Sequence, residues 1–278
     1  MLRFLILSGY FELMMYLQVS GKLDQFINVH YRYLAIISMI LSLLLALVQL
    51  FRWVKNDQEE HDHHGADHDH GLKKPHQRAI AYILLALPIM VGLLFPTVSL
   101  DTTIVQAKGF QFPVSQESVG DPEVQTQYLQ PNTSLYYNKS DYQKQMDKLM
   151  KKYSKDGVLQ ITDENYLDVM ELIYNYPSEF LGRKIIYQGF IYHAKQDAAE
   201  NNFVFRFGII HCVADSGVFG LLVHLPKGVT VKNDEWVRVE GTIGTDFYQP
   251  LKRELPTVAA AKVVKISAPK NQYVYHSF

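Results

Sequence analysis

Five of the chain's eleven histidines fall between residues 61 and 70, where they are interspersed with aspartates, with Gly65 inside the run and Gly71 directly after it. Imidazole nitrogens and carboxylates are the ligands that borderline divalent cations accept, and a glycine-containing loop lets several of them surround one ion. The alternative is a solvated polar linker that binds nothing. We predict a site for Zn²⁺ or a similar divalent metal, with the ligands His61, His63, His64, His68, His70, Asp62, Asp67 and Asp69.

A second set of metal-ligand types lies in the C-terminal half. His211, Cys212 and Asp215 would offer nitrogen, sulfur and oxygen donors at the end of a predicted strand, and His193 or His224 could join them from neighbouring strands. Adjacent strand residues point to opposite faces, so His211 and Cys212 can share an ion only if a turn or bulge begins there. Alternatively, Cys212 is a small buried apolar residue, or the nucleophile of a Cys-His pair, for which no family signature is present.

Glu12 is chemically unusual because it interrupts an apolar segment. An ionisable side chain inside a membrane helix is costly unless it is paired or faces water, which makes it a functional-site candidate. Its partner would be another subunit or a cation, since the other apolar segments contain no internal basic residue. The alternative is that Glu12 snorkels to an interface from a short, tilted helix.

Three apolar segments in residues 1–100 are long enough to cross a bilayer. They run from Leu2 to Val19, from Tyr33 to Val54 and from Ala79 to Pro96, and Pro88 is expected to kink the third. Basic residues, which are retained on the cytoplasmic side, concentrate around the loop 56–77. We predict a multi-pass cell-membrane protein with its N-terminus and His-rich loop in the cytoplasm and its C-terminal domain extracytoplasmic. A cleaved signal peptide is the alternative for the first segment, but that segment lacks an A-x-A site.

Composition and motifs narrow the function. A single cysteine excludes an intramolecular disulfide, and a formal net charge of −1 gives no basic footprint for nucleic acid. The sequence has no Walker loop, dinucleotide fingerprint, HExxH or G-x-S-x-G motif, so we do not expect an enzyme. Three spans are also too few for a self-sufficient secondary transporter.

The remaining chain divides into a tether and a folded domain. Residues 101–139 are rich in Gln, Ser, Thr, Pro and Gly, which is typical of a tether. In residues 140–278 we expect a helix from Ser140, a short strand and a second helix with Asp163 as its N-cap. Five runs of alternating residues follow, and they predict an OB-like five-stranded β-barrel with the preceding helix across its open end, or else a fragment of a β-sandwich. The runs are Lys184 to Ala194, Phe203 to His211, Phe219 to Leu225, Glu235 to Gly244 and Thr257 to Ile266.

The predicted fold class is therefore membrane α plus extracytoplasmic α+β. Four stretches carry a resemblance to a known family: LILSGYFELMMYLQVSGKLDQFIN (5–28), FLGRKIIYQGFIYH (180–193), FRFGIIHCVADSGVFG (205–220) and WVRVEGTI (236–243). Together they resemble the YcgQ-like permease-subunit family, in which a short membrane unit carries such a domain and is encoded beside a larger polytopic permease. The family pattern has paired cysteines before Ala-Ala-Asp. His211 replaces one thiol here, which keeps metal-ligand capability but rules out a redox dithiol.

The resemblance implies an accessory subunit of a membrane permease, and the His-rich loop suggests that the permease handles divalent or soft metal ions, with zinc favoured. Its partners would be a larger polytopic permease subunit, membrane lipid and the metal ion, and not nucleic acid. The barrel would act outside as a docking or gating module, and the loop inside as a metal acceptor or sensor. Two alternatives are a metal-responsive membrane receptor and an envelope-assembly protein, neither with transport activity.

Overall fold

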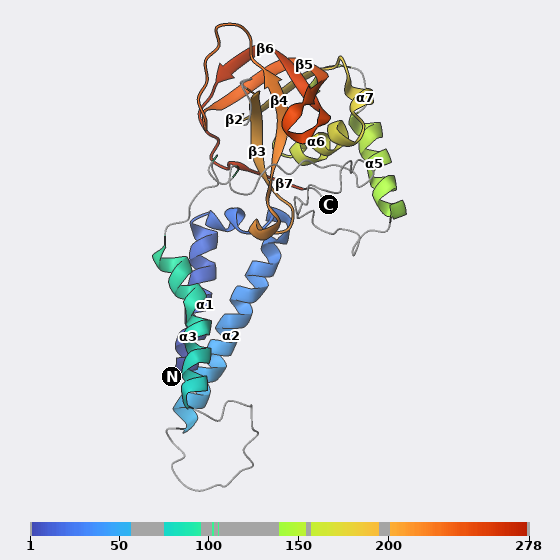
Figure 1. Ribbon diagram of the computed structural model, residues 1–278. Coiled ribbons are helices and arrows are strands. Elements are labelled where there is room, and N and C mark those ends of the chain that lie inside the picture. Colours follow the sequence, from blue (N-terminus) through green and yellow to red (C-terminus); the bar gives the residue numbers. More distant parts are fainter. Residues whose placement is uncertain are drawn as a thin grey trace. The chain divides into compact units, whose positions relative to one another are not determined.

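The structure is a computed structural model in which two compact units can be described, Met1–Ser99 and Leu100–Phe278 (Figure 1). Of the predicted tether, only Thr102, Val105 and Lys139 lie within the described part of the chain. The residues that the structure describes are 2–56, 75–95, 102, 105, 139–153, 157–194 and 201–276.

The described residues of the first unit form three α-helices, α1 (Leu2–Val19), α2 (Arg32–Asn56) and α3 (Pro75–Leu94). Each is long and apolar enough to cross a membrane, which confirms the predicted three-span membrane region. Two short 3₁₀ turns, Lys22–Gln25 and Val29–Tyr31, connect α1 to α2. The chain thus reverses direction between the first two spans without a long loop.

Helices α1 and α3 approach each other through glycines. Gly9 lies against Ile89, and a Cβ atom added at Gly92 would sit 2.7 Å from Leu13 Cδ1. Small residues at such contacts allow close helix packing in a membrane. Pro88 lies inside the continuous helix α3, and the Tyr10 hydroxyl donates a hydrogen bond of 2.9 Å to the Leu85 carbonyl in the preceding turn. This bond is the kind of neighbouring-helix support that an intramembrane proline needs.

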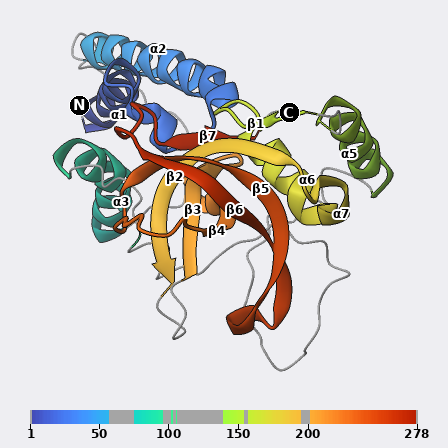
Figure 2. The ribbon, with the colours of Figure 1, turned by 90° about the horizontal axis from the view of Figure 1, so that it is seen from above.

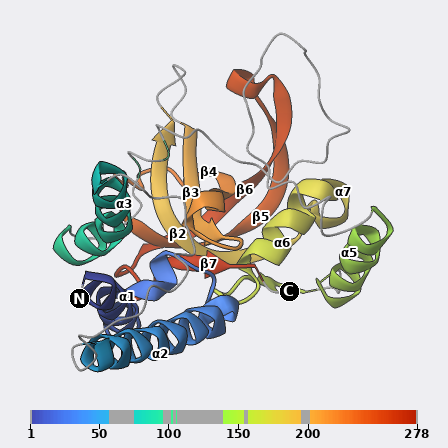
Figure 3. The same cartoon turned by 90° about the horizontal axis from the view of Figure 1, so that it is seen from below.

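The second unit contains the predicted barrel. Its five strands are β2 (Lys184–Ala194), β3 (Asn201–Ile209), β4 (Gly217–His224), β5 (Trp236–Tyr248) and β6 (Arg253–Lys265). They follow the order β2-β5-β6-β4-β3, and pairing of β2 with β3 closes the barrel (Figures 2 and 3). Only the β4–β6 pair is parallel within this ring. The arrangement confirms the OB-like five-stranded barrel.

Two further short strands pair with strands of the barrel. β1 (Leu159–Gln160) pairs in parallel with β2, at the place of the expected short strand. β7 (Tyr273–Tyr275) pairs in parallel with β3 and was not predicted. Gly189 allows the strands to close tightly, because a Cβ atom there would lie 2.4 Å from the Phe205 carbonyl oxygen.

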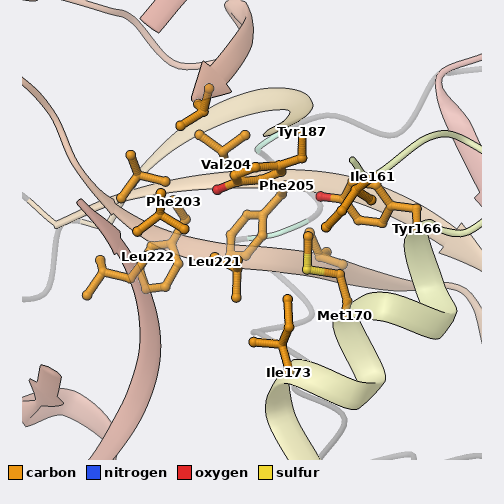
Figure 4. Close-up of a cluster of buried hydrophobic side chains, with 14 of the residues drawn as sticks. Ile161, Tyr166, Met170, Ile173, Tyr187, Phe203, Val204, Phe205, Leu221 and Leu222 are labelled. Atoms are coloured by element: carbon orange, nitrogen blue, oxygen red, sulfur yellow. The ribbon is translucent and has the colours of Figure 1, made fainter. Parts of the chain in front are cut away.

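Within the described ranges 139–153 and 157–194, the helices α5 (Lys139–Tyr153), α6 (Tyr166–Asn175) and α7 (Pro177–Phe180) precede the barrel strands. In Figure 4, Met170 and Ile173 project from α6 toward Phe205 and Leu221 of the barrel. These side chains belong to one buried apolar cluster that α6 and the strands share. α6 therefore packs directly on the barrel core.

Two tyrosine hydroxyls fasten α6 to strand β4. The Tyr174 hydroxyl donates to the Gly220 carbonyl at 2.7 Å, and the Tyr166 hydroxyl donates to the Phe219 carbonyl at 3.2 Å. Burial raises the pKa of both tyrosines, so both keep the proton that they donate. The helix is thus held by polar bonds as well as by apolar packing.

The expected start of α6 was wrong by two residues. Its N-cap is Asn165, not Asp163. The Asp163 carboxylate instead accepts a hydrogen bond of 2.7 Å from the Arg206 guanidinium of β3. The Asp163 side chain therefore pairs with a charged residue of the barrel and does not cap the helix.

Candidate functional site

All eight predicted ligands of the His-rich loop, residues 61–70, lie outside the described residues. The metal site predicted there consequently rests on the sequence alone.

The second predicted ligand set lies in a tight turn. Strand β3 ends at Ile209, and Val213–Asp215 form a 3₁₀ turn with Cys212 at its N-cap, so a turn does begin where two neighbouring ligands would require one. The Asp215 carboxylate accepts hydrogen bonds from the backbone N–H groups of His211, at 3.0 Å, and Cys212, at 2.9 Å. Its second oxygen lies 2.7 Å from His211 Nδ1. Asp215 is therefore engaged in holding the turn.

The turn does not assemble the expected N, S and O ligands. Across the described ranges, no group of three or more His, Cys, Asp or Glu side chains could hold a metal ion. His193 bonds instead to Asn202 and to the Val231 carbonyl, and His224 lies against Asp246. The residues at this site do not fit a metal centre, because the Asp215 carboxylate accepts hydrogen bonds from backbone N–H groups of the turn. In addition, His193 and His224 are bonded to other residues.

Glu12 occupies a distinctive position in the membrane unit. The buried residues of α1, Ile6, Leu13 and Leu17, follow helical spacing and mark the face toward the neighbouring helices. Glu12 is exposed and lies in the middle of the opposite face, which also carries exposed Leu5. Within the described part of the chain, Glu12 makes no hydrogen bond or ion pair with another residue. Its side chain therefore lies away from the buried face of α1, near the middle of the helix.

Arg206 is a functional candidate that the sequence analysis missed. Its side chain is completely buried in β3, and its guanidinium pairs with half-exposed Asp163. It also donates to three backbone carbonyls and lies over the rings of Tyr166 and Trp236. The signal in the sequence was a single arginine within the apolar run FVFRFGII.

The Arg206–Asp163 pair fixes one wall of a surface cleft. The cleft has a volume of about 540 Å³, and its polar lining includes Gln160, Asp163, Glu164, Gln188 and Arg238. Gln188 and Arg238 are direct neighbours on β2 and β5. Because the guanidinium holds Asp163, the position of this wall is tied to the barrel core.

A second missed feature joins distant parts of the second unit, residues 100–278. The backbone N–H and the hydroxyl of Thr102 both donate to the Asp234 carboxylate, at 3.0 and 2.8 Å. Both Thr102 and Val105 are almost completely buried, and Val105 belongs to the barrel's apolar cluster. Part of the predicted tether is therefore docked on the barrel.

Two family models match the chain: the DUF1980 N-terminal domain over residues 2–111 and the DUF1980 C-terminal domain over residues 136–276. A protein of Streptococcus mutans serotype c is 49% identical over the full length of both chains, and its name describes it as a candidate subunit of a two-component membrane permease complex. The UPF0703 protein YcgQ of Bacillus subtilis is 42% identical, again over the full length of both chains. No solved structure is significantly similar to the chain.

Proposed function

The chain belongs to the DUF1980 family, and on this basis we propose that it is an accessory subunit of a two-component membrane permease. The first support is the full-length similarity to the Streptococcus mutans protein, whose name describes such a subunit. The second is the small size of the membrane unit, because three spans do not provide the repeated helix bundles of a self-sufficient transporter.

The observation that carries the proposal is the outward position of Glu12. A carboxylate in the middle of a lipid-facing helix surface is unfavourable in the isolated subunit, because the bilayer core offers no water or counter-charge. A neighbouring subunit relieves this cost if it presents a basic or hydrogen-bond-donating side chain. The outward face of α1 is thus suited to contact with a larger polytopic partner.

We further propose that the permease handles divalent or soft metal ions, with zinc favoured. This part rests on the histidines and aspartates of residues 61–70, whose side chains are typical zinc ligands. The excess of lysine and arginine around this loop favours a cytoplasmic location, and the barrel would then be extracytoplasmic. In this arrangement the loop accepts or senses metal inside while the barrel docks or gates outside.

Co-purification from a membrane extract tests the subunit role. An affinity-tagged full-length chain should retain a polytopic membrane protein at a fixed stoichiometry in mild detergent. Recovery of the chain alone would contradict the permease proposal and favour a metal-responsive receptor. Recovery with a surface component would favour an envelope-assembly protein.

Calorimetric titration with Zn²⁺ tests the metal proposal separately. Replacing all five loop histidines by alanine should lower the Zn²⁺ stoichiometry of the full-length protein without changing the melting temperature of its metal-free form, because a loop contributes little to a packed core. The matched control replaces His193 and His224, which are bonded within the barrel, and should leave the stoichiometry unchanged. An unchanged stoichiometry in the loop variant would reduce residues 61–70 to a polar spacer.

A further inference from the structure

The contact between Thr102 and Asp234 joins two segments that are 132 residues apart in the sequence. Thr102 follows the last membrane helix, since α3 ends at Leu94. Asp234 lies immediately before strand β5 of the barrel. The contact therefore connects the chain that leaves the membrane unit with the body of the outer domain.

The geometry of Asp234 is specialised for this contact. Its backbone has a φ of 65°, a left-handed conformation that is uncommon for residues other than glycine. The carboxylate receives two hydrogen bonds from one residue, so both of its oxygens are occupied by Thr102. An unfavourable backbone conformation persists only where surrounding contacts stabilise it. At Asp234 the two hydrogen bonds from Thr102 are such contacts.

The contact also leads directly into the barrel. The Asp234 N–H donates to the Ile191 carbonyl of β2 at 2.9 Å, and the His193 N–H of the same strand donates to Asn233 Oδ1 at 2.7 Å. Val105, three residues beyond Thr102, is buried in the barrel's apolar cluster. A force on Thr102 would thus reach β2 through backbone hydrogen bonds.

We infer that the Thr102–Asp234 contact is a mechanical clamp that couples the third membrane helix to the barrel. Thr102 lies eight positions beyond Leu94, and a fully extended chain spans these eight steps with a reach of at most about 28 Å. The clamp therefore limits how far the barrel can move from the end of α3, whereas an unclamped tether would leave it free to diffuse. This inference does not depend on the permease role or on metal binding.

Two substitutions weaken the clamp without altering the barrel core: Thr102→Val removes one of its two hydrogen bonds and Asp234→Gly removes both. Thr102→Val removes the hydroxyl donor at nearly constant volume. Asp234→Gly removes the carboxylate, and glycine adopts a positive φ without strain, so the barrel should still fold. Thr230→Val is the matched control, because it makes the same chemical change at an exposed threonine in the same loop.

Pulsed electron paramagnetic resonance on the full-length protein in nanodiscs tests the coupling. One spin label is placed on Cys212, the chain's single cysteine, and the other on Phe95→Cys at the exposed end of the third span. The unsubstituted protein and Thr230→Val should give distance distributions of equal width, whereas Thr102→Val and Asp234→Gly should broaden the distribution, Asp234→Gly at least twofold. Equal widths in all four proteins would overturn the inference.

Hydrogen exchange provides a local readout of the same contact. The Thr102 amide donates to Asp234, so its exchange in Asp234→Gly should accelerate roughly fivefold or more. Amides of β2 and β5 should keep their protection, which would show that the barrel remains folded. Fast Thr102 exchange in the unsubstituted protein would contradict the clamp directly.

Discussion

If the proposed polytopic partner contacts Glu12, replacing Glu12 by glutamine should weaken that association, and it should lower the cost of placing the unpartnered chain in lipid. The side chain keeps its shape and loses its charge, so contacts that depend on shape alone would survive. Contacts that depend on the carboxylate would not. The substitution therefore separates an ion-paired interface from simple helix packing.

The expected magnitude follows from the position of Glu12 in α1. The helix has 18 residues, so it is about 27 Å long, and Glu12 lies about 2 Å from its midpoint. A charged side chain at the centre of a membrane helix costs about 3 kcal/mol on insertion scales. If the partner relieves most of this cost, glutamine should reduce the association free energy by about 2 kcal/mol, or raise the dissociation constant about 30-fold.

The dissociation constant can be measured by fluorescence energy transfer between the labelled chain and its labelled partner in lipid vesicles. Diluting both proteins with lipid lowers their concentration in the bilayer until the complex dissociates. Ser38→Ala is a suitable control, because it removes an exposed polar group from α2 rather than from the outward face of α1. Its dissociation constant should stay within about threefold of that of the unsubstituted protein, a difference below 1 kcal/mol. A Glu12→Gln variant within that same range would refute the pairing argument and indicate that Glu12 snorkels to an interface.

Three further outcomes test other parts of the molecule. Asp163→Asn should lower the free energy of unfolding of the second unit by about 2 to 3 kcal/mol in denaturant titrations, because it leaves the buried Arg206 guanidinium without its counter-charge. An unchanged unfolding midpoint would mean that the three backbone carbonyls suffice to stabilise Arg206. In a Cys212→Ser background, a cysteine at Asn56 should resist a membrane-impermeant thiol reagent in intact cells and one at Gln127 should react; the opposite pattern would reverse the proposed orientation. Hydrogen bonds from the Lys265 side chain and the Lys232 N–H hold the pKa of Glu235 below its usual range. The stability that Glu235 contributes is therefore present above its unfolded-state pKa and is lost as the pH falls through its folded-state pKa. Glu235→Gln should reduce this loss of melting temperature at acid pH, and an unaltered pH profile would contradict the argument.

The sequence determined the elements whose pattern is local. The three spans follow from apolar runs long enough to cross a bilayer, and the barrel strands follow from alternating residues, with β2 found at its predicted bounds from Lys184 to Ala194. Strand β7 was missed because Tyr273–Tyr275 is too short to show a period. Strand β5 runs on to Tyr248 because Gly244, the expected break, continues the ladder opposite Thr257.

Tertiary structure decided which side chains meet. The His211–Asp215 turn showed the right residue types for metal, but only its folded geometry reveals that Asp215 is engaged by backbone N–H groups. Glu12 was recognisable from its chemistry, whereas its outward direction depends on how α1 packs against α2 and α3. Arg206 and the Thr102–Asp234 clamp pair residues 43 and 132 positions apart. Periodicity along a chain reports the face on which a residue lies, but it carries no information about which distant residue the folded backbone will bring to that face.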